Sequence, residues 1–159
     1  MYNEIVLNKQ LFDALTEQAK ASPRLRTHFD LRDSSDDDSQ RMLNAIEPGS
    51  IFPIHRHNAT SETIAILRGK LEEILYDNRG NETARILLEP GGDNPAIQIP
   101  IGQYHTVHSL ESGTVILEIK NTKYNPDDME EFHLEDSKQL IPGQDYLLKS
   151  VQGQCSAST

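Results

Sequence analysis

The chain has 159 residues and a mass of 17.9 kDa, which is the size of one domain with its own hydrophobic core. Its 15 Lys and Arg are outnumbered by 25 Asp and Glu, which gives a formal net charge of -10 at pH 7. This balance argues against nucleic acid or an anionic membrane surface as a partner. No stretch reaches the roughly 18 consecutive apolar residues of a membrane span, and the N-terminus lacks a basic segment followed by an apolar one. We therefore expect a cytoplasmic protein.

The N-terminal residues 1–39 predict a short helix followed by an arm and an acidic loop. Asn8 is suited to cap a helix in which Leu11 and Leu15 lie on one face. The segment 33–39, with the sequence DSSDDDS, carries too much charge to be buried. We expect it to be a solvated loop that separates the arm from the main body.

The middle of the chain, residues 40–120, consists of short runs rich in Ile, Val, Leu and Thr, separated by Gly, Pro and Asn. Such runs predict β-strands, and many short strands without an intervening helical pattern favour an antiparallel sandwich or barrel. Residues 121–159 become polar again, and we expect an irregular C-terminal extension whose end, from residue 152, is disordered. The expected strands are 41–46, 62–68, 71–76, 83–88, 97–99, 105–110 and 114–120.

Four residues in this middle region have the spacing of metal ligands. His55 and His57 are two residues apart, so on an extended segment their side chains point to the same side and can converge on one ion. After the polar turn 58–61, Glu62 opens the next strand and can return a carboxylate to that side. His105 follows a turn that contains a proline and a glycine, and it can supply a third imidazole. We predict that these four side chains bind one metal ion.

Three imidazoles and one carboxylate suit a divalent transition metal, and Fe, Mn, Ni and Zn are all compatible with them. A closed structural zinc site is usually built with cysteines, but the only cysteine, Cys155, lies in the polar C-terminal tail. A single cysteine also excludes an internal disulfide. The predicted ligand set leaves coordination positions open, which favours chemistry or ligand binding. The competing interpretation is that the three histidines are polar rim residues of a metal-free barrel.

The same residues resemble the two sequence motifs of the cupin superfamily. The first motif, G-x5-H-x-H-x4-E-x6-G, matches at every position, and the second matches in part as P-x-G-x2-H, with its usual leading glycine offset. The resemblance covers about residues 40–120 and implies a mostly β fold, a small cupin-type β-barrel (double-stranded β-helix or jelly roll) with the metal inside its mouth. The matching residues are Gly49, His55, His57, Glu62 and Gly69 in the first motif, and Pro100, Gly102 and His105 in the second.

A closer resemblance is to the WbuC-like cupin metalloproteins of bacterial polysaccharide gene neighbourhoods. The shared segments are RMLNAIEPGS, PIHRHN, LRGKL, YDNRGN, IPIGQYHTV and VILEIK. The chain differs from that group at Ile101 and Tyr104, and it lacks the group's aromatic-proline ending after Pro126. This resemblance implies a sugar or sugar derivative as the small-molecule ligand and a place in polysaccharide metabolism.

The leading functional hypothesis is a metal-dependent isomerase or epimerase, in which the ion acts as a Lewis acid toward an oxygen-rich ligand. Two alternatives stay open: an iron-dependent dioxygenase, and a non-enzymatic module that binds a metabolite or the metal. Because cupin barrels commonly pair through sheet edges or exchanged arms, the resemblance also implies a homodimer.

Polar residues beside the expected ligands are candidates for the wall of a substrate pocket. They are Arg41, Arg68, Tyr104 and Glu118, with Tyr104 preferred because it adjoins His105. Arg56 lies between the two paired histidines and should point away from the metal. His108 lies three residues after His105 and is expected on the opposite face of its strand.

Overall fold

A computed structural model describes residues 3–133 of the chain. The expected disordered end from residue 152 and Cys155 lie outside the described residues. The elements are α1 (Lys9–Ala21), β1 (Arg26–Asp30), β2 (Gln40–Ile46), β3 (His55–His57), β4 (Glu62–Arg68), β5 (Leu71–Tyr76), β6 (Glu82–Leu88), β7 (Ala96–Ile99), β8 (Tyr104–Ser109), β9 (Thr114–Lys120), the 3-10 helix η1 (Pro126–Asp128) and β10 (Met129–Glu131).

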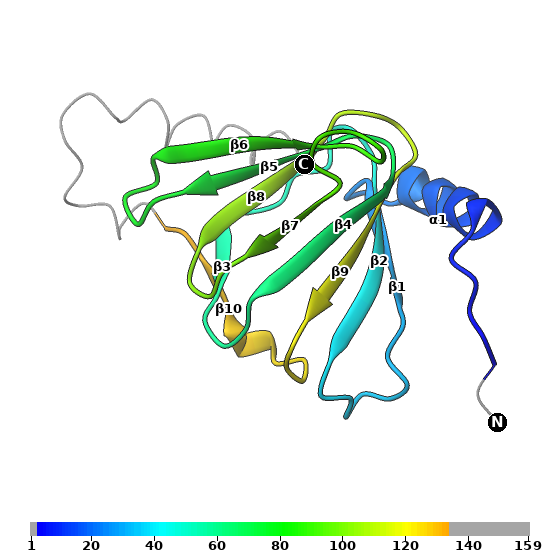
Figure 1. Cartoon of the computed structure of the whole chain (residues 1–159), viewed down its shortest axis with the longest axis horizontal. Coiled ribbons are helices and arrows are strands. Elements are labelled where there is room, and N and C mark those ends of the chain that lie inside the picture. The colour runs from blue at the N-terminus through cyan, green and yellow to red at the C-terminus, as the bar shows by residue number, and fades with distance from the viewer. Residues whose placement is uncertain (1–2, 134–159) are drawn as a thin grey trace.

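Two five-stranded antiparallel sheets form the body of the molecule (Figure 1). The first has the strand order β1-β2-β9-β4-β7, and the second has the order β10-β3-β8-β5-β6. Helix α1 contacts β1, β2 and β9 of the first sheet. The expected mostly β fold with a short N-terminal helix is therefore confirmed.

Side-chain alternation sorts the strands of the first sheet into an inner and an outer face. Inner residues such as Ile64 and Ile116 join the core between the two sheets, where they pack with Leu71 and Val107 of the second sheet. Outer residues of β2 and β9 pack under α1 instead; this cluster contains Phe12, Leu15, Ala19, Leu43, Ala45 and Val115. The inner face changes from apolar to polar toward one end of β4 and β9, where Glu62, Glu118 and Lys120 lie.

The helix begins where the sequence predicts it. The Asn8 side chain accepts a hydrogen bond of 3.0 Å from the backbone N–H of Leu11, which satisfies one of the free donors of the first turn. The buried face of the helix includes Leu15. No helix within residues 3–133 combines the length and the hydrophobicity that a membrane crossing requires.

Three strands were not among those expected from the sequence. β1 pairs along its whole length with β2, so part of the expected N-terminal arm is an edge strand of the barrel. β3 is the histidine segment itself, and β10 pairs with it from the C-terminal side. β1 and β10 have few apolar side chains and lack the alternating pattern by which a strand is recognised from sequence. They are strands because β2 and β3 beside them supply the hydrogen bonds.

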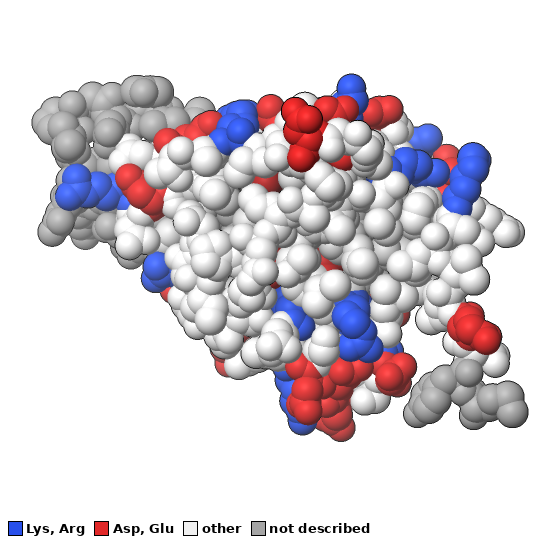
Figure 2. All heavy atoms as spheres, viewed as in Figure 1, with Lys and Arg blue, Asp and Glu red and all other residues white. Residues whose placement is uncertain are grey.

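The acidic segment between β1 and β2 lies at the surface, as expected. Its side chains at Asp33, Asp36 and Asp38 are exposed. Figure 2 shows acidic side chains gathered at the end of the molecule where this connection lies in Figure 1. Asp37 is the exception within the segment, because it forms an ion pair of 2.8 Å with Arg41 of β2.

Candidate metal centre

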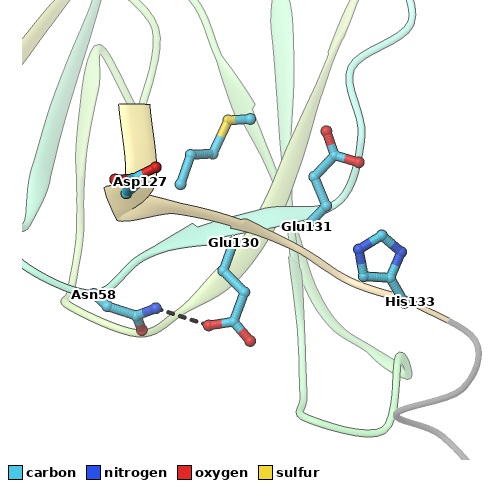
Figure 3. A pocket seen from close by; sticks show the side chains of 6 residues that line it. Asn58, Asp127, Glu130, Glu131 and His133 are labelled. Atoms are coloured by element: carbon cyan, nitrogen blue, oxygen red, sulfur yellow. Dashed lines mark hydrogen bonds between the residues drawn. The ribbon is translucent and has the colours of Figure 1, made fainter. Parts of the chain in front are cut away.

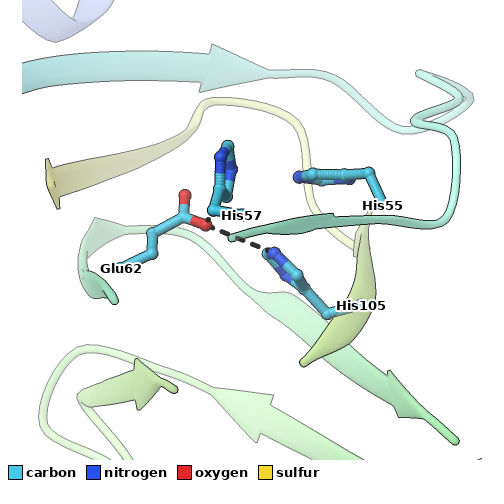
Figure 4. A group of neighbouring side chains, drawn as sticks. All are labelled: His55, His57, Glu62 and His105. Carbon is cyan, nitrogen blue, oxygen red and sulfur yellow. Dashed lines mark ion pairs between the residues drawn. The ribbon is translucent and has the colours of Figure 1, made fainter. Parts of the chain in front are cut away.

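The four predicted ligand residues meet at the polar end of the barrel (Figure 4). His55 and His57 come from β3, Glu62 opens β4, and His105 lies on β8. Each residue offers one donor atom, and these four atoms all lie within 4.8 Å of one another. The cluster therefore could hold a metal ion.

Strand pairing explains how residues distant in the chain come together. His55 lies directly opposite His105 in the β3–β8 ladder, and their ring centroids are 4.5 Å apart. The turn after β3 is fixed at both ends: the Gly102 N–H donates to the His57 carbonyl at 2.8 Å, and the Asn121 N–H donates to the Thr60 hydroxyl at 2.9 Å. This turn carries Glu62 back toward the two histidines.

His105 lies between two carboxylates in a fully buried position. Its Nδ1 lies 2.5 Å from Glu73 Oε1, so Nδ1 carries the proton and donates it. Its Nε2 lies 3.3 Å from Glu62 Oε2. Within the described residues, neither His105 Nε2 nor Glu62 Oε2 has a hydrogen-bond partner. Buried polar atoms without partners are costly, and a cation between these two would satisfy both, so the residues fit a metal ion.

The other two imidazoles are held in a comparable way. His55 Nδ1 lies 3.0 Å from the Pro53 carbonyl oxygen, which can only accept, so Nδ1 donates and Nε2 keeps a free lone pair. His57 Nε2 lies 3.6 Å from Glu62 Oε2, and its Nδ1 lies 3.6 Å from Asp128 Oδ2. In each histidine the Nδ1 side therefore faces an acceptor of the protein.

Burial and local charge set the protonation of the cluster. Burial lowers the pKa of His55 to about 4, so this imidazole is neutral at pH 7. Burial alone would raise the pKa of Glu62, but the attraction of His105 and the charge of Lys120 outweigh it and hold this pKa at about 2. A neutral imidazole and an ionised carboxylate are the forms that coordinate a metal.

His105 differs from the other two histidines in the metal-free protein. Burial by itself would lower the pKa of His105, but the contacts with Glu62 and Glu73 have the larger effect and raise this pKa to about 10. Burial raises the pKa of Glu73 to about 6 against the opposing effect of His105. Coordination through Nε2 therefore requires His105 to lose one proton.

A cavity of about 360 Å³ opens beside the four ligand residues. Its walls combine apolar side chains with polar ones, which is the usual composition of a small-molecule site. Outside the four ligand residues, the lining consists of Phe52, Pro53, Ile64, Val107 and Met129 on the apolar side, and of Arg24, Arg26, Asn44, Glu118, Lys120 and Glu131 on the polar side.

Glu118 and Lys120 form a charged pair in the cavity wall. Lys120 Nζ lies 3.8 Å from Glu118 Oε2 and 3.8 Å from Glu62 Oε1, so it connects this pair to the candidate ligands. Burial, followed by the charge of Glu62, raises the pKa of Glu118 to about 7 against the opposing charge of Lys120. A carboxyl group with such a pKa can both accept and release a proton near neutral pH.

Of the four residues expected to line the pocket, only Glu118 does so. Tyr104 points to the opposite face of β8 from His105, where it packs with Ile54 and Ile74. Arg41 lies on the outer face of β2 and pairs with Asp37. Both corrections have one cause, because neighbouring residues of a strand point to opposite faces of the sheet.

Arg68 also lies away from the cavity, for a different reason. Simple alternation along β4 would place it on the same face as Glu62 and Ile66, toward the barrel interior. The pairing of β4 with β9 shifts register between Ile66 and Arg68, as in a β-bulge, and Arg68 lies opposite Val115. Its guanidinium therefore reaches α1, where it pairs with Asp13 at 2.7 Å.

Glu73, Lys120 and Asp128 contact the site but were not among the predicted residues. For Glu73 a signal existed: it is an acidic residue on the same face of its strand as Leu71, a residue of the core. Lys120 shares the face of Glu118, two residues away on β9. Asp128 had no such signal, because nothing in the sequence near it indicates that its segment packs against β3.

Arg56 points away from the metal cluster, as expected, and pairs with Glu130 at 2.9 Å.

Comparisons with known proteins agree with the architecture. The model of a family described as "Domain of unknown function (DUF6016)" matches residues 7–88, just over half of the chain, and this stretch includes three of the four candidate ligands. No curated protein matches the sequence.

Several solved structures are similar in fold at low sequence identity. Protein SO0799 from Shewanella oneidensis has 15% identity and a TM-score of 0.62, over 92% of this chain and 98% of that one. Rru_A2000 from Rhodospirillum rubrum, a cupin-2 domain, has 16% identity and a TM-score of 0.57, over 84% and 83% of the two chains. The capsular polysaccharide assembling protein CapF from Staphylococcus aureus has 20% identity and a TM-score of 0.52, over 67% of this chain and 29% of its own. At these identities the likeness shows the cupin fold alone.

Proposed function

The chain belongs to the family described as a domain of unknown function (DUF6016), and we propose its function from the site, because that description states no activity. We propose a metal-dependent cupin that transfers protons on a small, oxygen-rich substrate. One observation carries the proposal. His105 Nε2 and Glu62 Oε2 are buried, face each other at 3.3 Å and lack a hydrogen-bond partner within the described residues. A metal ion placed between them would be coordinated by both atoms, in place of the proton that the contacts with Glu62 and Glu73 hold on His105.

The proposed ligands are His55, His57, Glu62 and His105, with a divalent Fe, Mn, Ni or Zn ion as the cofactor. Such an ion, when bound, supplies a Lewis acid that polarises a carbonyl or hydroxyl oxygen. Glu73 holds the ring of His105 through Nδ1, and the Pro53 carbonyl holds the ring of His55. Both contacts direct Nε2 toward the common centre.

The cavity places an acid–base pair beside these ligands. Glu118 lines it from β9, and Lys120 lies between Glu118 and Glu62. We assign Glu118 as the group that accepts or donates a proton on the substrate, and Lys120 as the charge that stabilises its carboxylate form. Phe52 and Val107 form part of the apolar wall and limit the access of water.

We infer a sugar or sugar derivative as the substrate class, and isomerisation or epimerisation as the reaction. The support is the resemblance to WbuC-like cupins, together with the cupin fold shared with CapF, whose description names capsular polysaccharide assembly. Isomerisation needs a polarised oxygen and a group that moves a proton, which the site offers as a metal centre and Glu118. A place in polysaccharide metabolism is part of the same proposal.

Metal analysis of protein purified without a chelating column tests the cofactor. We expect close to one equivalent of a divalent transition metal in the wild type. His57→Ala should lower metal affinity at least 10–100-fold. Loss of a residue that only hydrogen-bonds to a metal ligand already weakens binding by this much, and loss of the ligand itself should weaken it no less. The matched control is His28→Ala, which removes an exposed histidine of β1. Unchanged metal content in His57→Ala would overturn the ligand assignment.

Turnover on a panel of nucleotide sugars tests the reaction. Glu118→Gln should reduce turnover by at least 100-fold while the metal stays bound, because the amide can neither accept nor release the proton. Glu111→Gln, an exposed change in the β8–β9 connection, is the control. Tight binding without product would favour a non-enzymatic module. Loss of activity under nitrogen, with iron bound, would favour the oxygenase.

A further inference from the structure

Residues 125–132, which we call the strap, cross the barrel beside the strand that carries two candidate ligands. The strap contains η1 and β10, and β10 pairs with β3 in the register Met129 opposite His57 and Glu131 opposite His55. The Phe132 N–H donates to the Ile54 carbonyl at 2.8 Å and extends this pairing by one residue. The histidine segment is thus held between β8 on one side and the strap on the other.

Asp128 is the strap residue that reaches the ligand turn. Its Oδ1 accepts hydrogen bonds from the backbone N–H of Asn58 at 3.0 Å and of Ala59 at 2.7 Å. Its other oxygen, Oδ2, lies 3.6 Å from His57 Nδ1. Its side chain is only 11% exposed, whereas the preceding Asp127 is exposed. One carboxylate therefore contacts both the backbone that follows His57 and the far side of the His57 ring.

Glu130 forms a second link between the strap and the same turn. The Asn58 side-chain amide donates to Glu130 Oε2 at 2.7 Å, and Arg56 pairs with Oε1 at 2.9 Å (Figure 3 shows the first of these bonds). Arg56 and Asn58 flank His57 in the chain. The side chains on both sides of His57 are thereby tied to the strap.

The arrangement at His57 repeats what the other two histidines show. His55 and His105 each present Nδ1 to an acceptor, the Pro53 carbonyl and the Glu73 carboxylate, and each turns Nε2 toward the centre. Asp128 occupies the equivalent place at His57, at a longer distance. An acceptor behind a ligating imidazole fixes both its tautomer and its ring orientation.

We propose that Asp128 is a positioning residue for His57: it fixes the turn through two backbone N–H groups and favours the tautomer that leaves Nε2 free for the metal. The inference rests on the proposed metal-binding function. It makes the strap, a segment that the sequence places outside the barrel, part of the metal centre. Asp128 itself does not touch the ion or the substrate.

The test compares Asp128→Asn with Asp127→Asn in the full-length protein. The asparagine keeps an oxygen that can accept from Asn58 and Ala59, but its NH₂ group opposes a protonated Nδ1 of His57. We expect the affinity for cobalt(II), titrated by calorimetry after removal of bound metal, to fall 10–100-fold in Asp128→Asn and to change less than threefold in Asp127→Asn. Hydrogen exchange at the Asn58 and Ala59 amides should remain as slow as in the wild type.

This pair of measurements separates positioning of the ligand from general loss of structure. Wild-type cobalt affinity in Asp128→Asn would overturn the inference and leave the proposed function intact. Weakened affinity together with fast exchange at both amides would also overturn it, because the effect would then come from a disrupted turn. Should the wild type itself bind neither cobalt(II) nor zinc, the proposed function fails and the inference fails with it.

Discussion

At the scale of single residues, the ligand set follows from sequence but its surroundings do not. Two histidines on alternate positions of an extended segment point to the same side, so the convergence of His55 and His57 was predictable, although β3 itself was not among the expected strands. Glu73 lies behind His105 because β5 pairs with β8, and that pairing is not encoded near either residue. Tyr104 was assigned to the cavity because it adjoins His105, whereas alternation puts it on the other face.

His108 provides a test of stability against pH that is separate from the metal centre. It is half-buried on β8, opposite Glu72. Burial, followed by the charge of Arg85, lowers its pKa below the ordinary 6.5. Between these two pKa values the unfolded chain binds more protons than the folded chain, so stability is full above about 6.5 and decreases as the pH falls through that window.

Replacement of His108 by Gln removes this contribution. The free energy of unfolding of the wild type should therefore fall more steeply than that of His108→Gln between about pH 7 and about pH 5. Urea denaturation of both proteins at several pH values, in the presence of a chelator, measures the difference. Parallel curves for the two proteins would contradict the assignment of a lowered pKa to His108.

At the scale of elements, strands with apolar residues on one face were predictable from the sequence. Edge strands that form only because a neighbouring strand offers hydrogen bonds were not. The expected strands 62–68, 71–76 and 114–120 coincide with β4, β5 and β9, because each places alternate apolar residues in the core. β1 and β10 lie at sheet edges and depend on the pairing offered by β2 and β3. The bulge before Arg68 was equally unpredictable, since it follows from pairing with β9.

The turn between β4 and β5 depends on a glycine. Gly69 has φ +87°, and a Cβ there would lie 2.2 Å from Thr114 Oγ1 and 2.7 Å from Thr114 Cα. Gly69→Ala should therefore destabilise the fold by about 2–4 kcal/mol, from backbone strain plus the clash with the β9 backbone. The midpoint of urea unfolding measures the loss.

Gly91→Ala is the matched control for this turn. Gly91 also has a positive φ, +71°, but a Cβ there would meet nothing within 4 Å. Its substitution should cost only the backbone strain, about 1 kcal/mol. Equal losses for the two variants would show that the approach of Thr114 to Gly69 contributes nothing.

At the scale of the whole molecule, each sheet has two edge strands within the described residues: β1 and β7 in one sheet, β10 and β6 in the other. Leu87 on β6 and Ile119 on β9 are large apolar side chains that remain exposed. Open edges are common sites of pairing between chains. These features agree with the homodimer implied by the cupin resemblance, which stays a prediction.

Light scattering on the full-length protein measures its mass directly. We expect about twice the 17.9 kDa of one chain. Dilution should not change this value in the micromolar range. A mass of one chain at all concentrations would contradict the dimer and leave the metal centre unaffected.

The pairing of His55 with His105 has a kinetic consequence. The two residues are joined across the β3–β8 ladder but are 50 positions apart along the chain (105 minus 55), and Glu62 comes from the other sheet. The four ligands come together only after both sheets have assembled, so an ion gains its full binding strength late in folding. An ion bound as proposed would slow unfolding far more than it accelerates folding. Removal of such an ion should therefore show first as faster unfolding.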